Sequence, residues 1–567
     1  MVFTRKRESI MAKLFGKKQE RPRRVPGGNR VNAESLAADP QENKTVNPQE
    51  KPLSSYQFTA PVRDVYSLPA QRRRTQKRKR VNPKFILLCA LAVVLVFTLI
   101  FGIVRIAGNK KDQPGTPVQQ QVEVPKETQE PEKEKKPLFG FLKRDPKEET
   151  TEPTEPPTEP PTEPPMEIKQ TATISVTGDV LMHMPVIKSG YNSETKKYNF
   201  DKIFKYLTKY SSKADYAVAN LETTLAGTKD GYKYSGYPCF NCPDSITDAL
   251  KTAGFDMLLT ANNHCYDTRT VGLTRTLQVA AKRGLATLGT QAESSDKDYV
   301  VQDLNGIKVG MICYTYATND KDPERPSMNG IMVKADYADR INYFETDKLD
   351  QFYKQMSDQI DAMKAEGAEA IVLYIHWGQE YQTKANSTQK TMAQKLCDLG
   401  VDVIVGGHPH VIQPIQLLTS TEDENHKTVC LYSLGNAISN QRKDLMTLDT
   451  GHTEDGMLFS FTLAKYTDGE VMVDSIDVLP TWVYMKKAST NTYKIVPLDK
   501  SVADWSDAFK LSESATKNAK KSYDRTMAIV GDGLTASNEF LTARRETKLE
   551  DRREPALPAE PVADAAA

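Results

Sequence analysis

Cysteine and histidine are both scarce in this chain of 567 residues, which contains seven of each. Only one Cys-x-x-Cys spacing occurs, between Cys239 and Cys242. The lack of a second matching pair argues against a four-cysteine zinc module, and leaves a local disulfide or a metal knuckle open for this pair. Cys313, Cys397 and Cys430 lie in apolar stretches, and we expect them to be buried free thiols.

The first 84 residues lack any long apolar run, which argues against a cleaved signal peptide, because such a peptide normally lies within about the first 30 residues. The total charge of +2 hides an uneven distribution. Residues 1–84 carry 21 Lys and Arg against 7 Asp and Glu, a net charge of +14, and the remainder carries −12. A basic arm of this kind binds acidic lipid or nucleic acid. Since it precedes a hydrophobic segment, we expect a membrane partner and no nucleic acid.

The hydrophobic segment Phe85–Val104 is a run of 20 residues without a charge. About 20 apolar residues suffice for a helix to cross the hydrocarbon core of a bilayer. A cluster of basic residues between Arg72 and Lys84 abuts its N-terminal end. By the positive-inside rule, the sequence predicts a single-pass cell-membrane protein with a cytoplasmic N-terminus and an extracellular C-terminal domain.

Composition divides the chain into five segments. Residues 1–84 are predicted to be a disordered basic cytoplasmic arm, and 85–107 a transmembrane helix. Residues 108–167 are a Pro/Glu/Thr-rich extracytoplasmic linker, whose Thr-Glu-Pro-Pro-like repeats favour extended polyproline geometry. Residues 168–500 form the predicted folded domain. Residues 501–567 are predicted to be a polar helical segment and a disordered tail.

The folded segment alternates apolar strands with helices. Strands are expected at 173–176, 215–219, 255–260, 307–314, 370–375, 401–405, 429–433, 457–464 and 471–478, and helices at 243–254, 273–284, 349–366 and 389–399. Nearly uninterrupted apolar strands with intervening helices imply a sheet covered on both faces. The sequence therefore predicts an α/β fold.

Five of the seven histidines follow predicted strands, in short polar motifs. The motifs are Gly178-Asp179 with His183, Asn220-Leu221-Glu222, Asn262-Asn263-His264, His376-Trp377-Gly378 and Gly407-His408-Pro409-His410. Residues just past the C-terminal ends of strands in an open α/β sheet converge on one crevice. A crevice with carboxylates, amides and imidazoles is typical of a metal site. We interpret it as a metal-dependent hydrolase site, with enough ligands for two metals bridged by Glu222 or Asp179.

Each motif alone has a plainer interpretation. Asp179 is also suited to cap a helix, whereas Glu222 is a poor N-cap, which favours a ligand role for it. A single histidine such as His376 at the end of an apolar strand is usually a core residue. The proline between His408 and His410 biases His408 towards an extended conformation, so that both rings would face one site. A polar turn with solvated histidines is the alternative.

The order of the motifs resembles that in the bacterial CapA family, also called PgsA, of capsule or poly-γ-glutamate synthesis proteins. The resemblance covers about Thr171 to Leu498 and includes further residues around these motifs: Asp267, Glu380-Tyr381, Val411 and Tyr432-Ser433-Leu434-Gly435-Asn436. The family is similar in turn to calcineurin-like metallophosphoesterases. The resemblance implies a four-layer αββα metallophosphatase-like sandwich, two divalent metal ions (Mn, Zn or Fe) and membrane attachment.

The resemblance also implies residue roles. The implied metal ligands are Asp179, Glu222, Asn263, His376, His408 and His410. The implied catalytic residues are His264, as an acid, and Asp267, and the implied substrate-binding residues are Asn220, Trp377, Glu380 and Asn436. This sequence has Leu181 where phosphoesterases have a histidine, and Glu222 where they have an aspartate. Thr268-Arg269 stands where the family more often has an aromatic residue and a glycine.

Two functions from different classes follow. The first is a cell-surface hydrolase that uses metal-activated water on a phosphoester or on the end of an anionic polymer such as poly-γ-glutamate. The second is a non-catalytic assembly factor, whose pocket binds the polymer beside a membrane synthase. The anchor and the linker suit both functions, because both place the domain outside the membrane.

Overall fold

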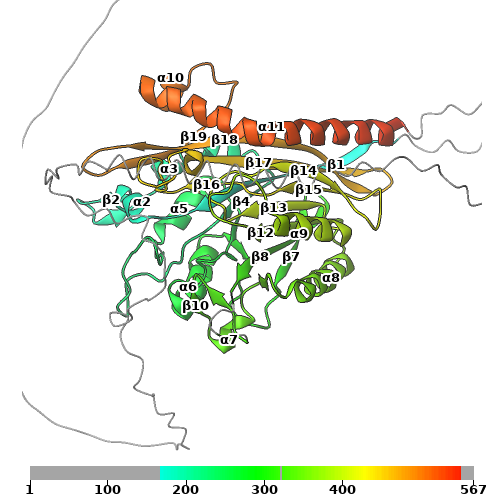
Figure 1. Ribbon diagram of the computed structural model, residues 1–567, viewed down its shortest axis with the longest axis horizontal. Helices are drawn as coiled ribbons and strands as arrows, with labels where there is room; N and C mark the ends of the chain where they lie inside the picture. Colours follow the sequence, from blue (N-terminus) through cyan, green and yellow to red (C-terminus); the bar gives the residue numbers. More distant parts are fainter. Residues whose placement is uncertain (1–165, 319–321, 323, 551–567) are drawn as a thin grey trace, which may run out of the picture. The chain divides into compact units, whose positions relative to one another are not determined.

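The computed structural model describes residues 166–318, 322 and 324–550 (Figure 1). The predicted basic arm, the predicted transmembrane helix at 85–107 and the predicted tail from 551 lie outside these residues, as does the linker up to residue 165. Among the described residues, no helix combines the length and the apolar character needed to cross a membrane.

The first of two large sheets contains the N-terminal strand of the domain at its centre. Its order is β19 (Thr492–Pro497), β18 (Val471–Lys486), β17 (Asp455–Tyr466), β1 (Ile168–Val180), β4 (Tyr216–Asn220), β5 (Met257–Leu259) and β6 (Ala286–Leu288), and β16 (Asn436–Ile438) pairs with the end of β1. Strands β1, β4, β5 and β6 are parallel, and β17 is antiparallel to β1. β1 is longer than the predicted strand at 173–176 because β17 pairs with it along most of its length.

The second sheet is parallel through its centre. Its order is β11 (Tyr343–Glu345), β8 (Ile307–Ala317), β12 (Ala370–His376), β13 (Val403–Gly407), β15 (Lys427–Leu431) and β14 (Ile415–Thr419), and β7 (Tyr299–Leu304) pairs with β8. β12 lies between β8 and β13 and is buried at every position, as its uninterrupted apolar sequence predicts.

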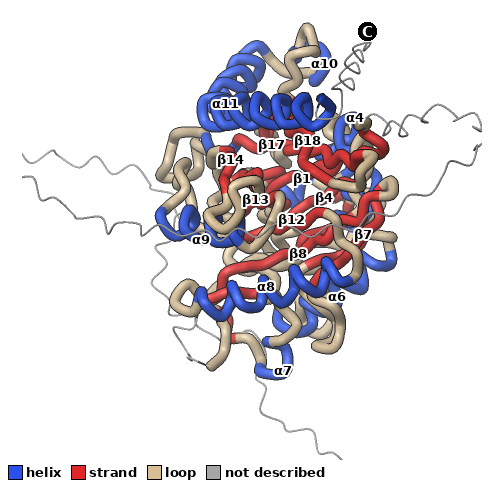
Figure 2. The backbone as a smooth tube through the Cα atoms, turned by 90° about the vertical axis from the view of Figure 1, so that its right-hand side faces the viewer, coloured by secondary structure: helices blue, strands red, loops and turns tan. Residues whose placement is uncertain are grey.

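The two sheets face each other across one hydrophobic core. That core combines Val176 of β1 and Phe459 of β17 with Met311 of β8 and Tyr374 of β12. Helices cover the outer faces (Figure 2). The first sheet packs on α2 (Met184–Ser189), α3 (Asp201–Phe204), α5 (Ser245–Thr252) and α6 (Arg269–Lys282), and the second packs on α8 (Leu349–Ala365) and α9 (Ser387–Asp398). The prediction of a mixed α/β fold is confirmed.

Short elements occupy the connections. They are β2 (Tyr191–Asn192), β3 (Lys197–Tyr198), α4 (Thr208–Ser211), β9 (Ser327–Met328), β10 (Ile331–Met332), α7 (Ala335–Ala338), the 3-10 helix η2 (His452–Glu454) and α10 (Trp505–Phe509). The longer predicted helices begin and end close to their predicted positions. For α9, the start is set by a capping box in which the side chain of Asn386 accepts from the backbone N–H of Gln389, and the side chain of Gln389 accepts from that of Asn386.

The long C-terminal helix α11 (Glu513–Glu550) packs back on the domain and runs along the sheets (Figure 1). Val530 and Leu541 of this helix are buried in the core between the sheets. Gly533 lies so close to β14 that a Cβ there would be 2.1 Å from the carbonyl oxygen of Ile415. The sequence places this helix in a segment separate from the 168–500 domain, whereas in the structure it completes the core. Its weak amphipathicity conceals this role, since only a narrow line of its residues is buried.

The six cysteines among the described residues are free thiols. Cys313, Cys397 and Cys430 are buried, as expected for cysteines in apolar strands and helices. Cys239 and Cys242 do not pair with each other.

Candidate metal centre

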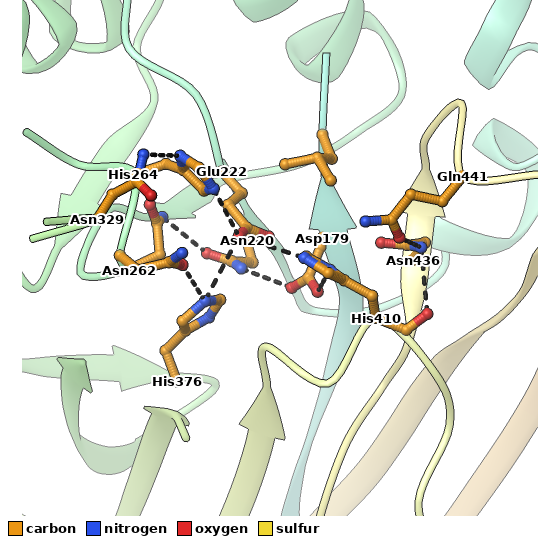
Figure 3. Close-up of polar contacts among 12 residues, drawn as sticks. Asp179, Asn220, Glu222, Asn262, His264, Asn329, His376, His410, Asn436 and Gln441 are labelled. Atoms are coloured by element: carbon orange, nitrogen blue, oxygen red, sulfur yellow. Dashed lines mark hydrogen bonds and ion pairs between the residues drawn. The ribbon is translucent and has the colours of Figure 1, made fainter. Parts of the chain in front are cut away.

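The C-terminal ends of strands from both sheets bring the predicted motifs together (Figure 3). Asp179 lies near the end of β1, Glu222 follows β4, and Asn263 follows β5, all in the first sheet. His376 is the last residue of β12, and His410 follows β13, both in the second sheet. The convergence requires close backbone packing. At Gly178, for example, a Cβ would lie 1.9 Å from the carbonyl oxygen of Gly435.

Asp179 is fully buried and fully hydrogen bonded. Its Oδ1 accepts from Asn220 Nδ2 at 2.7 Å, and its Oδ2 accepts from His410 Nδ1 at 3.0 Å. Burial alone would raise the pKa of Asp179, but the hydrogen bond from His410 and the nearby histidine charges outweigh it and lower this pKa. Burial would likewise lower the pKa of His410, but the charge of Glu222 and the hydrogen bond to Asp179 raise it to about 10.

Glu222 is also fully buried, yet neither of its carboxylate oxygens has a hydrogen-bond partner among the described residues. Three imidazoles point their Nε2 atoms at its Oε1. The distances are 3.5 Å for His376, 3.9 Å for His410 and 4.0 Å for His264. A buried carboxylate without hydrogen bonds carries a large desolvation cost, which the charge of His410 offsets in part. A metal cation between Glu222 and the rings of His376 and His410 would offset it further.

Two groups of possible ligand atoms meet at Glu222. Within each group the ligand atoms lie within 4.8 Å of one another. One group is Asp179, Glu222 and His410, and the other is Glu222, His376 and His408. Asn263 adjoins the second group, because its Oδ1 lies 2.8 Å from His376 Nε2. The donors are carboxylate, amide and imidazole atoms, which suit Mn, Fe and Zn. The residues therefore fit divalent metal, and Glu222 belongs to both groups.

The two histidines of the His408-Pro409-His410 motif are not extended, and that prediction is wrong. Their φ angles are +93° and +56°, in the left-handed region that side chains disfavour. The chain turns here, and the turn rather than an extended alternation brings both rings to the site, with centroids 5.9 Å apart. Such strain is characteristic of functional sites. Burial and the neighbouring histidines lower the pKa of His408 well below its usual value, so its ring is neutral, the form that binds metal.

His264 and Asp267 form a hydrogen-bonded pair at the edge of this centre. His264 Nδ1 lies 2.7 Å from Asp267 Oδ2. Burial would lower the pKa of His264, but the carboxylate of Asp267 raises it, with a smaller contribution from Glu222. Asp267 also accepts from the backbone N–H of Phe240 at 2.6 Å and from Asn329 Nδ2 at 2.9 Å. The pair is therefore held from two other parts of the chain.

The four residues predicted to bind substrate occupy different positions. Asn220 orients Asp179. Asn436 is fully buried and donates to the backbone carbonyls of His410 and Thr453 and to Gln441. Trp377 is buried and donates to the carbonyl oxygen of Tyr432 at 3.0 Å, so it packs behind the site. Glu380 is partly exposed. A substrate-binding role for each of the four stays a prediction.

His183 lies in neither ligand group. Its Nδ1 accepts from the backbone N–H of Asn440 at 3.3 Å, and its ring meets the edge of Phe240.

Two residues near the centre were not predicted from the sequence. They are Asn329, which follows β9, and Tyr316, whose ring lies 4.7 Å from that of His408. Tyr316 could have been found as a polar residue at the end of the predicted strand 307–314. Asn329 has no local signal.

Comparisons with known proteins support the family resemblance that the order of the motifs indicates. Residues 173–441 match the family model described as "Bacterial capsule synthesis protein PGA_cap". Over 278 residues the chain is 28% identical to the capsule biosynthesis protein CapA of Bacillus anthracis, an alignment that covers 47% of this chain and 60% of that protein. Over 306 residues it is 28% identical to the PGA biosynthesis protein CapA of Bacillus subtilis, covering 54% of this chain and 71% of that protein.

A more distant relative is a probable polyglutamine synthesis accessory protein of Mycobacterium tuberculosis, 27% identical over 212 residues, which are 36% of this chain and 52% of that protein. The alignments thus span between about half and seven tenths of the relatives' lengths. A crystal structure of a putative 5'-nucleotidase from Staphylococcus aureus overlaps 62% of this chain and 58% of its own, with 14% identity and a TM-score of 0.33, a likeness too low to carry an argument.

Proposed function

Residues 173–441 form a domain of the bacterial capsule synthesis family PGA_cap, and from this premise we propose that the chain is a hydrolase of capsule or poly-γ-glutamate synthesis. We infer a metallophosphatase-like domain, with two facing sheets, helices on the outer faces and a metal centre at the strand ends. The substrate is a phosphoester or the end of an anionic polymer.

The observation that carries this proposal is the environment of Glu222. Its two buried oxygens lack hydrogen bonds to the described residues, and three imidazole Nε2 atoms lie between 3.5 and 4.0 Å from Oε1. A carboxylate that only stabilised the fold would be hydrogen bonded in such a place. Oxygens without protein donors are free to bind cations, and Glu222 would serve as such a ligand.

The proposed chemistry divides among the residues of the site. Two divalent ions, when bound, supply hydroxide near neutral pH and neutralise an anionic substrate. Asp179, Glu222 and His410 would hold one ion, and Glu222, Asn263, His376 and His408 the other. His264 would give a proton to the leaving oxygen through Nε2, since its Nδ1 is bonded to Asp267. Asp267 keeps the ring in that orientation.

A second candidate function is a non-catalytic factor that binds polymer beside a membrane synthase. The name of the Mycobacterium tuberculosis relative, an accessory protein of polyglutamine synthesis, favours this function. In that case the same centre would bind the carboxylates of the polymer without turning it over.

An assay of the purified full chain separates the two candidates. We would load it with Mn²⁺ or Zn²⁺ and offer an aryl phosphate and poly-γ-glutamate. Metal-dependent turnover that is lost in His408→Ala supports the hydrolase, and binding of the polymer without turnover supports the accessory factor. The matched control is His426→Ala, because His426 is bonded to the carbonyl of Val401 and belongs to neither ligand group. If wild type neither binds nor turns over either compound, both candidates fail.

We also propose that residues 85–107 anchor the protein in the cell membrane, with the domain outside. The proposal rests on the 20-residue charge-free run and the basic cluster that precedes it. Protease added to cells without their wall should then remove the 168–500 region and spare the N-terminal arm. Protection of the 168–500 region would contradict the proposed topology.

A further inference from the structure

Tyr316, the penultimate residue of β8, lies against one of the two ligand groups. Its neighbour Thr315 pairs in register with His376 on β12. The ring of Tyr316 is nearly parallel to that of His376, at 5° with 6.4 Å between centroids. It lies closer to His408, at 4.7 Å. The side chain thus belongs to the same sheet edge as the candidate metal ligands.

The hydroxyl of Tyr316 makes no hydrogen bond to any described residue, and it is not one of the buried polar atoms, so it is open to solvent. Tyr314, two residues earlier on the same strand, donates its hydroxyl to Gln359 Oε1 at 2.8 Å. With no competing protein acceptor, the hydroxyl of Tyr316 can exchange its hydrogen bond to water for one to a bound ligand.

The chemistry of the side chain defines what Tyr316 can do. A phenol is protonated at neutral pH, so the hydroxyl of Tyr316 is a hydrogen-bond donor.

We propose that Tyr316 is a substrate-binding residue whose hydroxyl donates a hydrogen bond to an oxygen of an anionic phosphoryl or carboxylate group held at the metal centre. This inference rests on the proposed function and names a contact that the family motifs leave out. The plainer alternative is that the ring only packs against His376 and His408 and keeps them in place. The two differ in what the hydroxyl alone contributes.

The test compares Tyr316→Phe with Tyr314→Phe in the full, metal-loaded chain. Both variants remove one hydroxyl from β8, and only the first removes it from a ring that lies against His376 and His408. The probe is inorganic phosphate, measured by calorimetry, with metal content and melting temperature as further readouts. We expect phosphate binding to weaken roughly tenfold or more in Tyr316→Phe, because hydrogen bonds to charged oxygens are the strong ones. Metal content should stay unchanged, and Tyr314→Phe should bind phosphate as wild type does.

Each other outcome overturns the proposal in a distinct way. Equal phosphate binding by Tyr316→Phe and wild type removes Tyr316 from the substrate site and leaves the proposed function intact. Loss of metal from Tyr316→Phe assigns the residue to packing around the histidines. If metal-loaded wild type itself binds no phosphate and hydrolyses no aryl phosphate, the proposed phosphoesterase function fails, and the role of Tyr316 fails with it.

Discussion

Asp179 and His410 join the two sheets of the domain through one hydrogen bond of 3.0 Å between Oδ2 and Nδ1. Asp179 belongs to β1 in the first sheet, and His410 follows β13 in the second. Both side chains are buried. The centre therefore forms only when the two sheets are correctly packed on each other, so that the geometry of the site and the stability of the core depend on the same contacts.

Glu222→Gln should separate metal binding from folding. The substitution removes a buried charge that three histidines face, so metal-free Glu222→Gln should be less stable than metal-free wild type, and the test compares the gain in melting temperature that metal gives each protein. Wild type should melt at higher temperature with Mn²⁺ or Zn²⁺, since a ligand that binds only the folded state stabilises it by mass action. In the variant this gain should disappear, and bound metal measured by elemental analysis should fall. A variant that keeps the full metal complement would show that Glu222 is not the shared ligand.

His264→Ala should lower turnover by roughly 10²–10⁴-fold, the usual contribution of a general acid or base. Metal content should be unchanged, because His264 Nδ1 is bonded to Asp267 and its Nε2 is 4.0 Å from Glu222. Asp267→Asn should reduce turnover in the same direction, since it weakens the contact that orients the ring. Metal lost together with activity in His264→Ala would instead identify His264 as a ligand.

Acid should destabilise the domain through His183. Burial lowers the pKa of His183 from the usual 6.5 to about 3, so the folded protein holds this ring neutral. The unfolded chain takes up the proton below about pH 6.5, and the stability contributed by the neutral ring is lost as the pH falls from there towards 3. At pH 5 this loss is on the order of 2 kcal/mol.

The free energy of unfolding, measured in denaturant at pH 7 and pH 5, tests whether acid destabilises the domain through His183. Wild type should lose about 2 kcal/mol more than His183→Gln between the two values. Equal losses in wild type and His183→Gln would mean that His183 does not contribute to the acid sensitivity.

The helix α11 should prove essential to the core. Leu541 is buried between the sheets, whereas its neighbour Phe540 is 37% exposed. Leu541→Ala should lower the free energy of unfolding by about 2–5 kcal/mol, because it leaves a cavity in the shared core. Phe540→Ala should cost much less, and thermal melts of the two variants give the comparison. Similar small effects from both would indicate that α11 is dispensable.

Much of the fold followed from local pattern. The apolar run at 370–375 predicted β12, which the structure extends by one residue to His376, and the spacing at 349–366 predicted α8. Strand ends are where polar side chains can leave a parallel sheet, so the motifs with Asp179, Glu222 and Asn263 could be placed on one edge from sequence alone. These features depend on residues that are close together in the chain, so the spacing of apolar residues predicts them directly.

The remainder depended on contacts between distant parts of the chain. Sequence could not place Asn329 beside Asp267, because the contact spans 62 residues and no pattern marks it. The left-handed turn at His408 and His410 overrode the preference set by the intervening proline, since the packing of two sheets fixes that backbone.

The sequence by itself determined which chemical groups reach the sheet edge, because strand periodicity and the position of each motif after its strand depend only on residues close together in the chain. Only the tertiary structure decided that Glu222 lies between two ligand groups and that α11 completes the core. Both outcomes depend on how two sheets with separate sequences pack face to face, and the free energy of that packing comes from apolar surface that each sheet buries only against the other.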